Sequence, residues 1–140
     1  MTFRPRVFLL EEANALLPEL DSSLARLVHK KEIYARCHDE LLMHELLVQA
    51  EHHAGTPAAD PPGGIEADIR AVEAAIEDLE KEIEQIRALG CVLRSIDRGW
   101  VDFLSNRDGE TIYLCWRRGE KSIQFFHNAR GGMTARQPLF

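Results

Sequence analysis

Residues 65–86 read IEADIRAVEAAIEDLEKEIEQI, and their large apolar residues recur at alternating intervals of four and three positions. This spacing places them on one stripe of an α-helix and is typical of helices that pack as coiled coils. Gly90 follows at a position that suits a helix C-terminus. The pattern predicts a helix over residues 64–89 that needs a partner helix. The stripe consists of Ile65, Ile69, Val72, Ile76, Leu79, Ile83 and Ile86.

The partner helix is expected upstream, over residues 11–52, where a similar spacing recurs and is diluted by polar residues toward its end. Glu11 and Glu12 suit a helix N-terminus because the helix dipole favours negative charge there. Pro18 either kinks this segment or begins a second helix. Residues 53–63 are rich in proline, glycine and small residues, which indicates a loop. We therefore predict a long antiparallel α-helical hairpin of the coiled-coil type.

The last third of the chain changes its apolar period from 3.6 to two. Residues 91–128 contain four short alternating runs separated by DRG, RDG and GE. Asp-Gly and Gly-x dipeptides between such runs are strong hairpin signals. We predict a four-stranded antiparallel β-meander, with residues 6–9 as an additional edge strand and residues 129–140 as a tail. The predicted fold is α+β, with residues 1–140 forming one domain.

Turn chemistry also predicts a register for the meander. We assume two-residue turns at Asp108-Gly109 and Gly119-Glu120, and a three-residue turn with Gly99 in the left-handed conformation. One set of residues then shares the face that packs on the helices: Leu93, Val101, Phe103, Ile112, Leu114, Trp116, Ile123 and Phe125.

His127 is expected at the end of this core face, in a row with Ser105 and Ile112. A histidine at a sheet end is commonly held by one hydrogen bond and has no further role. The alternative is a general base or ligand contact beside Glu11, Glu12 or Asn14. The sequence leaves both options open.

The opposite face of the predicted sheet is less polar than a solvated face should be. We expect burial against a second subunit or partner, and the candidate interface residues are Trp100, Leu104, Tyr113 and Phe126. The alternatives are a solvated face and a small-anion pocket that uses Arg94 and Arg117.

Charge and length exclude several classes of function. The 140 residues carry a net charge of −6, and residues 1–90 hold 18 acidic against 9 basic side chains. Such an acidic region repels phosphate, so we predict no nucleic-acid binding. No apolar run approaches the roughly 20 residues that span a membrane, and no apolar segment resembles a signal peptide. The three widely spaced cysteines, Cys37, Cys91 and Cys115, favour buried thiols in a reducing cytoplasm.

Known catalytic motifs are absent from the sequence. It contains no Gly-rich nucleotide-binding motif and no nucleophile elbow. HELLV begins like a zinc protease signature at His44, but Val48 stands where the second histidine is needed. We therefore predict no metal site and no cofactor. An enzyme interpretation rests on His127, Glu120 and nearby arginines.

Three stretches, LLEEANALLPEL, DRGWVDFLSNRDGETIYLCWRRGE and FFHNARGGMTARQPL, resemble the bacterial family known as domain of unknown function 2203. The resemblance spans nearly the whole chain and implies a small bacterial cytoplasmic protein without an established activity. The sequence departs from the family pattern at Leu10, Phe126 and Ala135. Position by position, the resemblance points to Glu11, Glu12, Asn14, Asp102, Trp116, Glu120, His127 and Arg136.

Together these observations favour a non-catalytic interaction module that forms a homodimer through the second sheet face or the helical hairpin. An unidentified protein is the other kind of partner. The competing class is a small-anion enzyme or sensor. In that class His127 is the acid or base, Glu120 is its partner, and Arg117 or Arg136 holds the anion.

Overall fold

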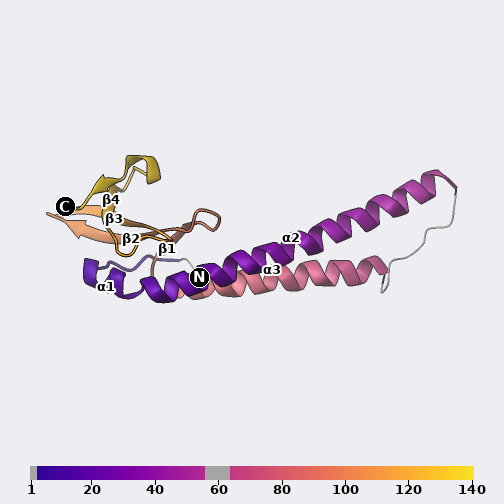
Figure 1. Cartoon of the computed structure of the whole chain (residues 1–140), viewed down its shortest axis with the longest axis horizontal. Coiled ribbons are helices and arrows are strands. Elements are labelled where there is room, and N and C mark those ends of the chain that lie inside the picture. Colours follow the sequence, from indigo (N-terminus) through magenta and orange to yellow (C-terminus); the bar gives the residue numbers. More distant parts are fainter. Residues whose placement is uncertain (1–2, 56–63) are drawn as a thin grey trace. The chain divides into compact units, whose positions relative to one another are not determined.

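The computed structural model describes residues 3–55 and 64–140 and confirms the predicted α+β fold (Figure 1). The chain divides into two compact units. The first contains the residues up to Val28 and those from Glu82 onward, and we call it the sheet unit. The second is His29–Lys81, and we call it the helical unit. Each is described separately.

The helices are α1 (Leu10–Ala15), α2 (Leu17–His53) and α3 (Gly64–Ala88). The predicted alternatives at Pro18 are thus decided in favour of a second helix, because α1 ends before Leu16 and Pro18 is the second residue of α2. Proline is tolerated there because its missing N–H would have no partner within the helix.

Inside the helical unit, α2 and α3 contribute both buried apolar side chains and polar contacts. Ala75 of α3 is buried. His44 Nδ1 of α2 lies 2.5 Å from a carboxylate oxygen of Asp68 of α3, so this contact joins the two helices. The predicted loop over residues 53–63 falls largely on residues 56–63, which lie outside the described part of the chain.

The sheet contains β1 (Val92–Ser95), β2 (Trp100–Arg107), β3 (Glu110–Arg117), β4 (Phe125–Asn128) and β5 (Gln137–Pro138). Consecutive strands are antiparallel neighbours, as predicted for a meander. β5 is an additional short strand within the predicted tail. In place of an edge strand at residues 6–9, Val7 forms a single parallel bridge to Leu104 of β2.

The predicted two-residue turn at Asp108-Gly109 is confirmed. At Gly99 the left-handed conformation is confirmed, but the predicted three-residue length is wrong, because Ser95 pairs with Trp100 and four residues lie between them. Arg107 pairs with Glu110 across the Asp108-Gly109 turn. Gly99 has a φ of 63°, in the left-handed region that favours glycine. These turns set the register of β2 and β3, which keeps the predicted core face. Its buried members are Val101, Phe103, Ile112, Leu114 and Trp116.

The core of the sheet unit lies between this face and the helices. Buried apolar side chains from the N-terminal segment and all three helices complete it, namely Phe8, Ala13, Leu17, Leu20, Leu24, Leu27 and Ile86. Glu82 of α3 is also buried and accepts hydrogen bonds from Ser23 Oγ and Arg26 Nε of α2. Among the described residues, the α-helices of the sheet unit lie on one side of the sheet, and the C-terminal segment with its short 3-10 helix (Met133–Ala135) lies on the other (Figure 1).

The predicted register of β4 is wrong by one residue. Tyr113, rather than Ile112, pairs with His127, and Cys115 pairs with Phe125. Because successive side chains of a strand point to opposite faces, this difference moves His127 and Phe125 from the core face to the outer face. The candidate site therefore lies on the side of the sheet turned away from the helical core.

Candidate functional site

A buried polar cluster lies on the outer face of the sheet. Asp102 of β2, Cys115 of β3 and His127 of β4 are at most 1% exposed. Asp102 and Cys115 face each other as a cross-strand pair, and His127 comes from the next strand along. Their candidate ligand atoms all lie within 4.8 Å of one another. We call these three residues the outer-face cluster.

Asp102 is the centre of the hydrogen bonding in this cluster. Its Oδ2 accepts from Arg94 Nε and lies equally close to His127 Nε2, at 2.9 Å in each case. Its Oδ1 accepts from the indole N–H of Trp100 at 2.7 Å. Moving a carboxylate out of water costs hydration free energy. The hydrogen bonds that these partners donate to Asp102 offset this cost.

His127 is fixed at both ring nitrogens. Nδ1 lies 2.8 Å from the backbone carbonyl oxygen of Asn128, and Nε2 faces Asp102. A carbonyl oxygen only accepts, so Nδ1 carries a proton and donates it. The ring stacks on Tyr113, with a centroid distance of 5.4 Å and an interplanar angle of 28°. The orientation of the imidazole is therefore set before any ligand arrives.

Cys115 completes the cluster as a thiol. The pKa of the Cys115 thiol is raised from 9.0 to about 12. Burial is the larger cause, and the negative charge of the neighbouring Asp102 carboxylate is the next. A nucleophilic cysteine needs a lowered pKa and a nearby base. His127 directs its nitrogens to Asp102 and Asn128 instead. Cysteine-based nucleophilic catalysis is therefore not supported by this geometry.

The C-terminal segment of the same chain covers part of the outer face. A Cβ added to Gly131 would lie 3.4 Å from the Cβ of His127, and one added to Gly132 would lie 3.6 Å from the indole of Trp100. Arg136 stacks on the Phe125 ring, with its Cζ 3.9 Å from the ring centroid. Part of the aromatic outer face is thus occupied without a second chain.

In the competing enzyme interpretation Glu120 is the partner of His127 and Arg136 can hold the anion, but Glu120 and Arg136 contact each other. Nη2 of Arg136 donates to both carboxylate oxygens of Glu120, at 3.1 Å to Oε1 and 3.0 Å to Oε2. Glu120 Oε1 also accepts from the backbone N–H of Arg117, whose side chain is exposed. His127 contacts Asp102 rather than Glu120. An anion that binds Arg136 therefore has to compete with Glu120.

The loop between β3 and β4 explains the shifted register. It is longer than a two-residue turn, because β3 ends at Arg117 and β4 begins at Phe125. Within it, the backbone oxygen of Glu120 accepts a hydrogen bond from Trp116 Nε1. Further along, the backbone N–H of Ile123 donates to Asn14 Oδ1 of α1 at 2.8 Å. Asn14 thus anchors this loop on the core side, and His127 lies on the other face.

The two predicted N-terminal carboxylates have different surroundings. Glu12 accepts a hydrogen bond from the backbone N–H of Leu9 and pairs with Arg6, so it caps α1 in place of an N-cap hydroxyl. Glu11 is exposed. Of the interface candidates, Trp100, Leu104 and Tyr113 are half-buried on the outer face. Phe126 is half-buried too, but its predicted place on the outer face is wrong, because it pairs with Leu114 and so belongs to the core face, where the guanidinium of Arg107 lies over its ring.

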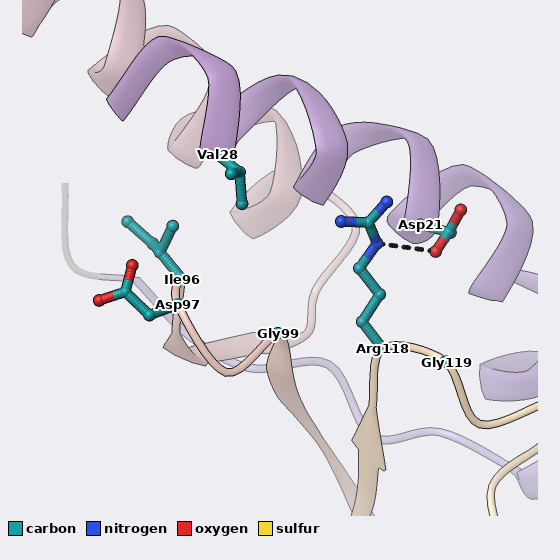
Figure 2. Close-up of a pocket in the computed structure, with 7 residues that line it drawn as sticks. All are labelled: Asp21, Val28, Ile96, Asp97, Gly99, Arg118 and Gly119. Carbon is teal, nitrogen blue, oxygen red and sulfur yellow. Dashed lines mark hydrogen bonds and ion pairs between the residues drawn. The ribbon is translucent and has the colours of Figure 1, made fainter. Parts of the chain in front are cut away.

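A separate hollow of about 420 Å³ lies in the sheet unit between α2 and two loops (Figure 2). Asp21 and Val28 of α2 form one wall, and the turn before β2 and the loop after β3 form the other. Arg118 Nε donates to Asp21 Oδ1 at 2.9 Å, as the dashed line shows. The basic residue that lines this hollow is thus already paired.

Comparison with known protein families identifies the family to which the chain belongs. Residues 6–139 match the family described as an uncharacterized conserved protein, DUF2203. The chain belongs to the DUF2203 family. No curated protein and no solved structure is significantly similar to it. Among the described residues, no helix is both long and apolar enough to cross a membrane.

The DUF2203 description assigns no activity, so the chemistry of the outer-face cluster comes from its residues. One thiol, one imidazole and one carboxylate are the side chains that bind zinc and related ions. The sequence singled out His127, and the family resemblance added Asp102, but the predicted register put these two residues on opposite faces of the sheet. The missing information was the register of β4, which places His127 beside Asp102 of β2 and Cys115 of β3.

Proposed function

We propose that this DUF2203 protein is a non-catalytic interaction module of the cytoplasm that forms a homodimer through its helical unit. The observation that carries the proposal is an apolar strip on α2, which we call the α2 strip. Its side chains are between 46% and 56% exposed, although they are large and apolar. They are Leu42, Met43, Leu46 and Leu47.

The positions of these residues make them one continuous surface. Residues four apart on a helix are neighbours on the same side. Leu42 therefore lies beside Leu46, and Met43 lies beside Leu47. His44, which points to Asp68 of α3, marks a different side of α2. Exposed apolar residues that are adjacent rather than scattered are typical of interaction sites.

α3 supports the same conclusion from its own pattern. Ile69 and Ile76 belong to the regular apolar stripe of α3, yet each is more than a third exposed, at 39% and 38%. Two helices alone cannot enclose a coiled-coil seam from all sides, whereas four helices can. A second hairpin packed against the first would bury these residues together with the α2 strip.

A second copy of the chain is the occupant that we favour. It brings an identical apolar strip, and a two-fold axis makes such a surface complementary to itself. The outer sheet face is a weaker candidate because Trp100 and Tyr113 already contact Asp102 and His127 within the chain. The enzyme alternative lacks support from the geometry, since His127 and Glu120 have separate partners.

Light scattering with size-exclusion chromatography tests the proposal. The chain mass is 15.9 kDa, so we expect the wild type to elute with twice that mass. The double variant Leu42→Gln, Leu46→Gln is expected to elute as a monomer with an unchanged circular dichroism spectrum. Both changes remove apolar surface at exposed positions, so folding of the monomer is spared.

A matched variant on the sheet shows whether the α2 strip or the outer sheet face forms the dimer interface. Leu104→Gln changes a half-buried interface candidate on the outer sheet face and is expected to leave the dimer intact. A dimer that splits with Leu104→Gln and survives the α2 double change would place the interface on the sheet and contradict the proposal. A monomeric wild type at high protein concentration would contradict self-association altogether.

A further inference from the structure

We propose that Asp102, Cys115 and His127 bind a divalent transition-metal ion of the zinc type. This inference is independent of the proposed dimer, because all three residues belong to the sheet unit and the dimer is assigned to the helical unit. It also goes beyond the family description, which names no ligand.

The spacing of the three ligand atoms fits a metal site. Zinc binds sulfur at about 2.3 Å and nitrogen or oxygen at about 2.0 to 2.2 Å, so tetrahedral ligand atoms lie roughly 3.3 to 3.8 Å apart. In the structure the pair formed by His127 Nε2 and Asp102 Oδ2 is 2.9 Å apart, and every pair of candidate atoms is within 4.8 Å. Adjustments of about an ångström are enough to bring all three onto one ion.

The orientation of His127 is a second and independent observation. Its Nδ1–H donates to the Asn128 carbonyl oxygen, which leaves Nε2 as the nitrogen directed into the cluster. A metal-binding histidine characteristically donates its other ring N–H to a carbonyl or carboxylate in this way. The backbone of β4 therefore selects Nε2 as the nitrogen that binds the ion, and the contact between Nε2 and Asp102 Oδ2 is replaced by the two bonds to the metal.

Asp102 keeps its other partners when an ion binds. A carboxylate has about four lone-pair sites, so it can bind a metal and still accept from Arg94 and Trp100. Hydrogen bonds to a ligating carboxylate are a common feature of metal sites because they fix its orientation. Arg94 is 38% exposed, which allows its positive charge to remain partly solvated beside the ion.

Charge balance favours the same class of ion. A divalent cation is neutralised by one thiolate and one carboxylate, and the neutral imidazole adds a ligand without charge. The metal takes the place of the Cys115 proton, which burial otherwise holds tightly. A thiolate with an imidazole selects zinc, cobalt or related ions over magnesium and calcium, which prefer oxygen ligands alone.

Cobalt(II) provides a direct probe. The full chain is treated with a chelator, exchanged into buffer and titrated with cobalt chloride. We expect one equivalent per chain and a near-ultraviolet thiolate-to-cobalt charge-transfer band. Cys115→Ser is expected to remove that band and to weaken cobalt binding by at least about 100-fold. Cys91→Ser changes a buried thiol outside the cluster and is expected to retain the band.

X-ray absorption spectroscopy of the zinc-loaded wild type provides a measurement that needs no variant. We expect one sulfur scatterer together with nitrogen or oxygen scatterers at the ion. Binding without a sulfur ligand that disappears in His52→Ala, His53→Ala would assign the ion to exposed histidines and overturn the proposal. Absence of binding to the wild type, or a charge-transfer band that persists in Cys115→Ser, would also overturn it.

Discussion

His127 of β4 reaches past β3 to Asp102 of β2, so that His127 Nε2 and Asp102 Oδ2 lie 2.9 Å apart in a buried environment. This contact joins strands that are not direct neighbours in the sheet. It depends on the β4 register, since a slip of one residue would put His127 on the other face. The pair therefore ties the register of the sheet to the geometry of the outer-face cluster.

The first prediction concerns the stability of this pair in chelator-treated protein. Asp102→Asn removes the charge that faces His127 and Arg94 while keeping the side chain's size. Because Arg94 and Trp100 then lose an ionised hydrogen-bond acceptor at a buried position, we expect a loss of about 3 kcal/mol in the free energy of unfolding. Urea unfolding followed by circular dichroism measures it.

Asp108→Asn is the matched control for Asp102→Asn. Asp108 is exposed in the β2–β3 turn with a φ of 51°, a conformation that asparagine also tolerates. We expect its change in unfolding free energy to stay within about 0.5 kcal/mol. Equal effects of the two substitutions would show that the Asp102 charge contributes little to stability.

The second prediction compares two glycines with left-handed backbone. Gly99 and Gly109 have φ values of 63° and 84°. A Cβ at Gly99 would lie 2.6 Å from Arg118 Cβ, whereas a Cβ at Gly109 would meet nothing within 4 Å. We expect Gly109→Ala to cost about 1 kcal/mol from backbone strain alone, and Gly99→Ala to cost clearly more. Thermal unfolding of both variants checks the order, and equal melting temperatures would contradict it.

Much of the fold was predictable because local chemistry determines it. The apolar stripe of α3 and the Asp108-Gly109 turn each depend on a few neighbouring residues, whereas Pro18 left a kink or a second helix open. Such features depend on helix geometry and turn conformation, which a sequence displays directly. The core face of β2 and β3 followed from them.

The outer-face cluster was not predictable because it depends on a long-range detail. The sequence suggests a two-residue turn at Gly119-Glu120, but Trp116 and Asn14 hold a longer loop there through hydrogen bonds to Glu120 and Ile123. That difference shifts β4 by one residue and carries His127 to the side of Asp102 and Cys115. Side chains distant in sequence thus decided which face bears the site.

The third prediction tests the electrostatics of the proposed dimer. Residues 29–81 carry 12 acidic and 5 basic side chains, so two helical units repel each other. Salt screens this repulsion, because the Debye length falls from about 30 Å at 0.01 M to about 3 Å at 1 M. We therefore expect the dimer dissociation constant to fall about fivefold or more between 0.05 and 0.5 M sodium chloride, measured by sedimentation equilibrium.

Charge-neutral variants give this third prediction its control. Glu45 is exposed near the α2 strip, and Glu110 is exposed on the sheet. We expect Glu45→Gln to tighten the dimer at low salt and to reduce the salt dependence, whereas Glu110→Gln should change neither. A dimer that weakens as salt rises would indicate an interface built from ion pairs and would contradict the role of the α2 strip.

The fourth prediction uses the Cys91 thiol, which is buried outside the cluster and donates to the Ile86 carbonyl oxygen at 3.4 Å. Burial raises its pKa from 9.0 to about 11. Between these values the unfolded chain loses the thiol proton while the folded chain keeps it, so rising pH favours the unfolded state. Below pH 9 both states hold the proton, and Cys91 adds no pH dependence.

Urea unfolding between pH 8 and 11 measures this contribution as a difference in slope. Other groups also titrate in this range, so the comparison is between wild type and Cys91→Ala. We expect the wild type to lose stability more steeply, with the extra slope approaching about 1.4 kcal/mol per pH unit above pH 9. Ile112→Val, a buried change without a titrating group, should lower stability equally at every pH. Parallel slopes for wild type and Cys91→Ala would mean that the folded protein does not hold the Cys91 proton more tightly than the unfolded chain.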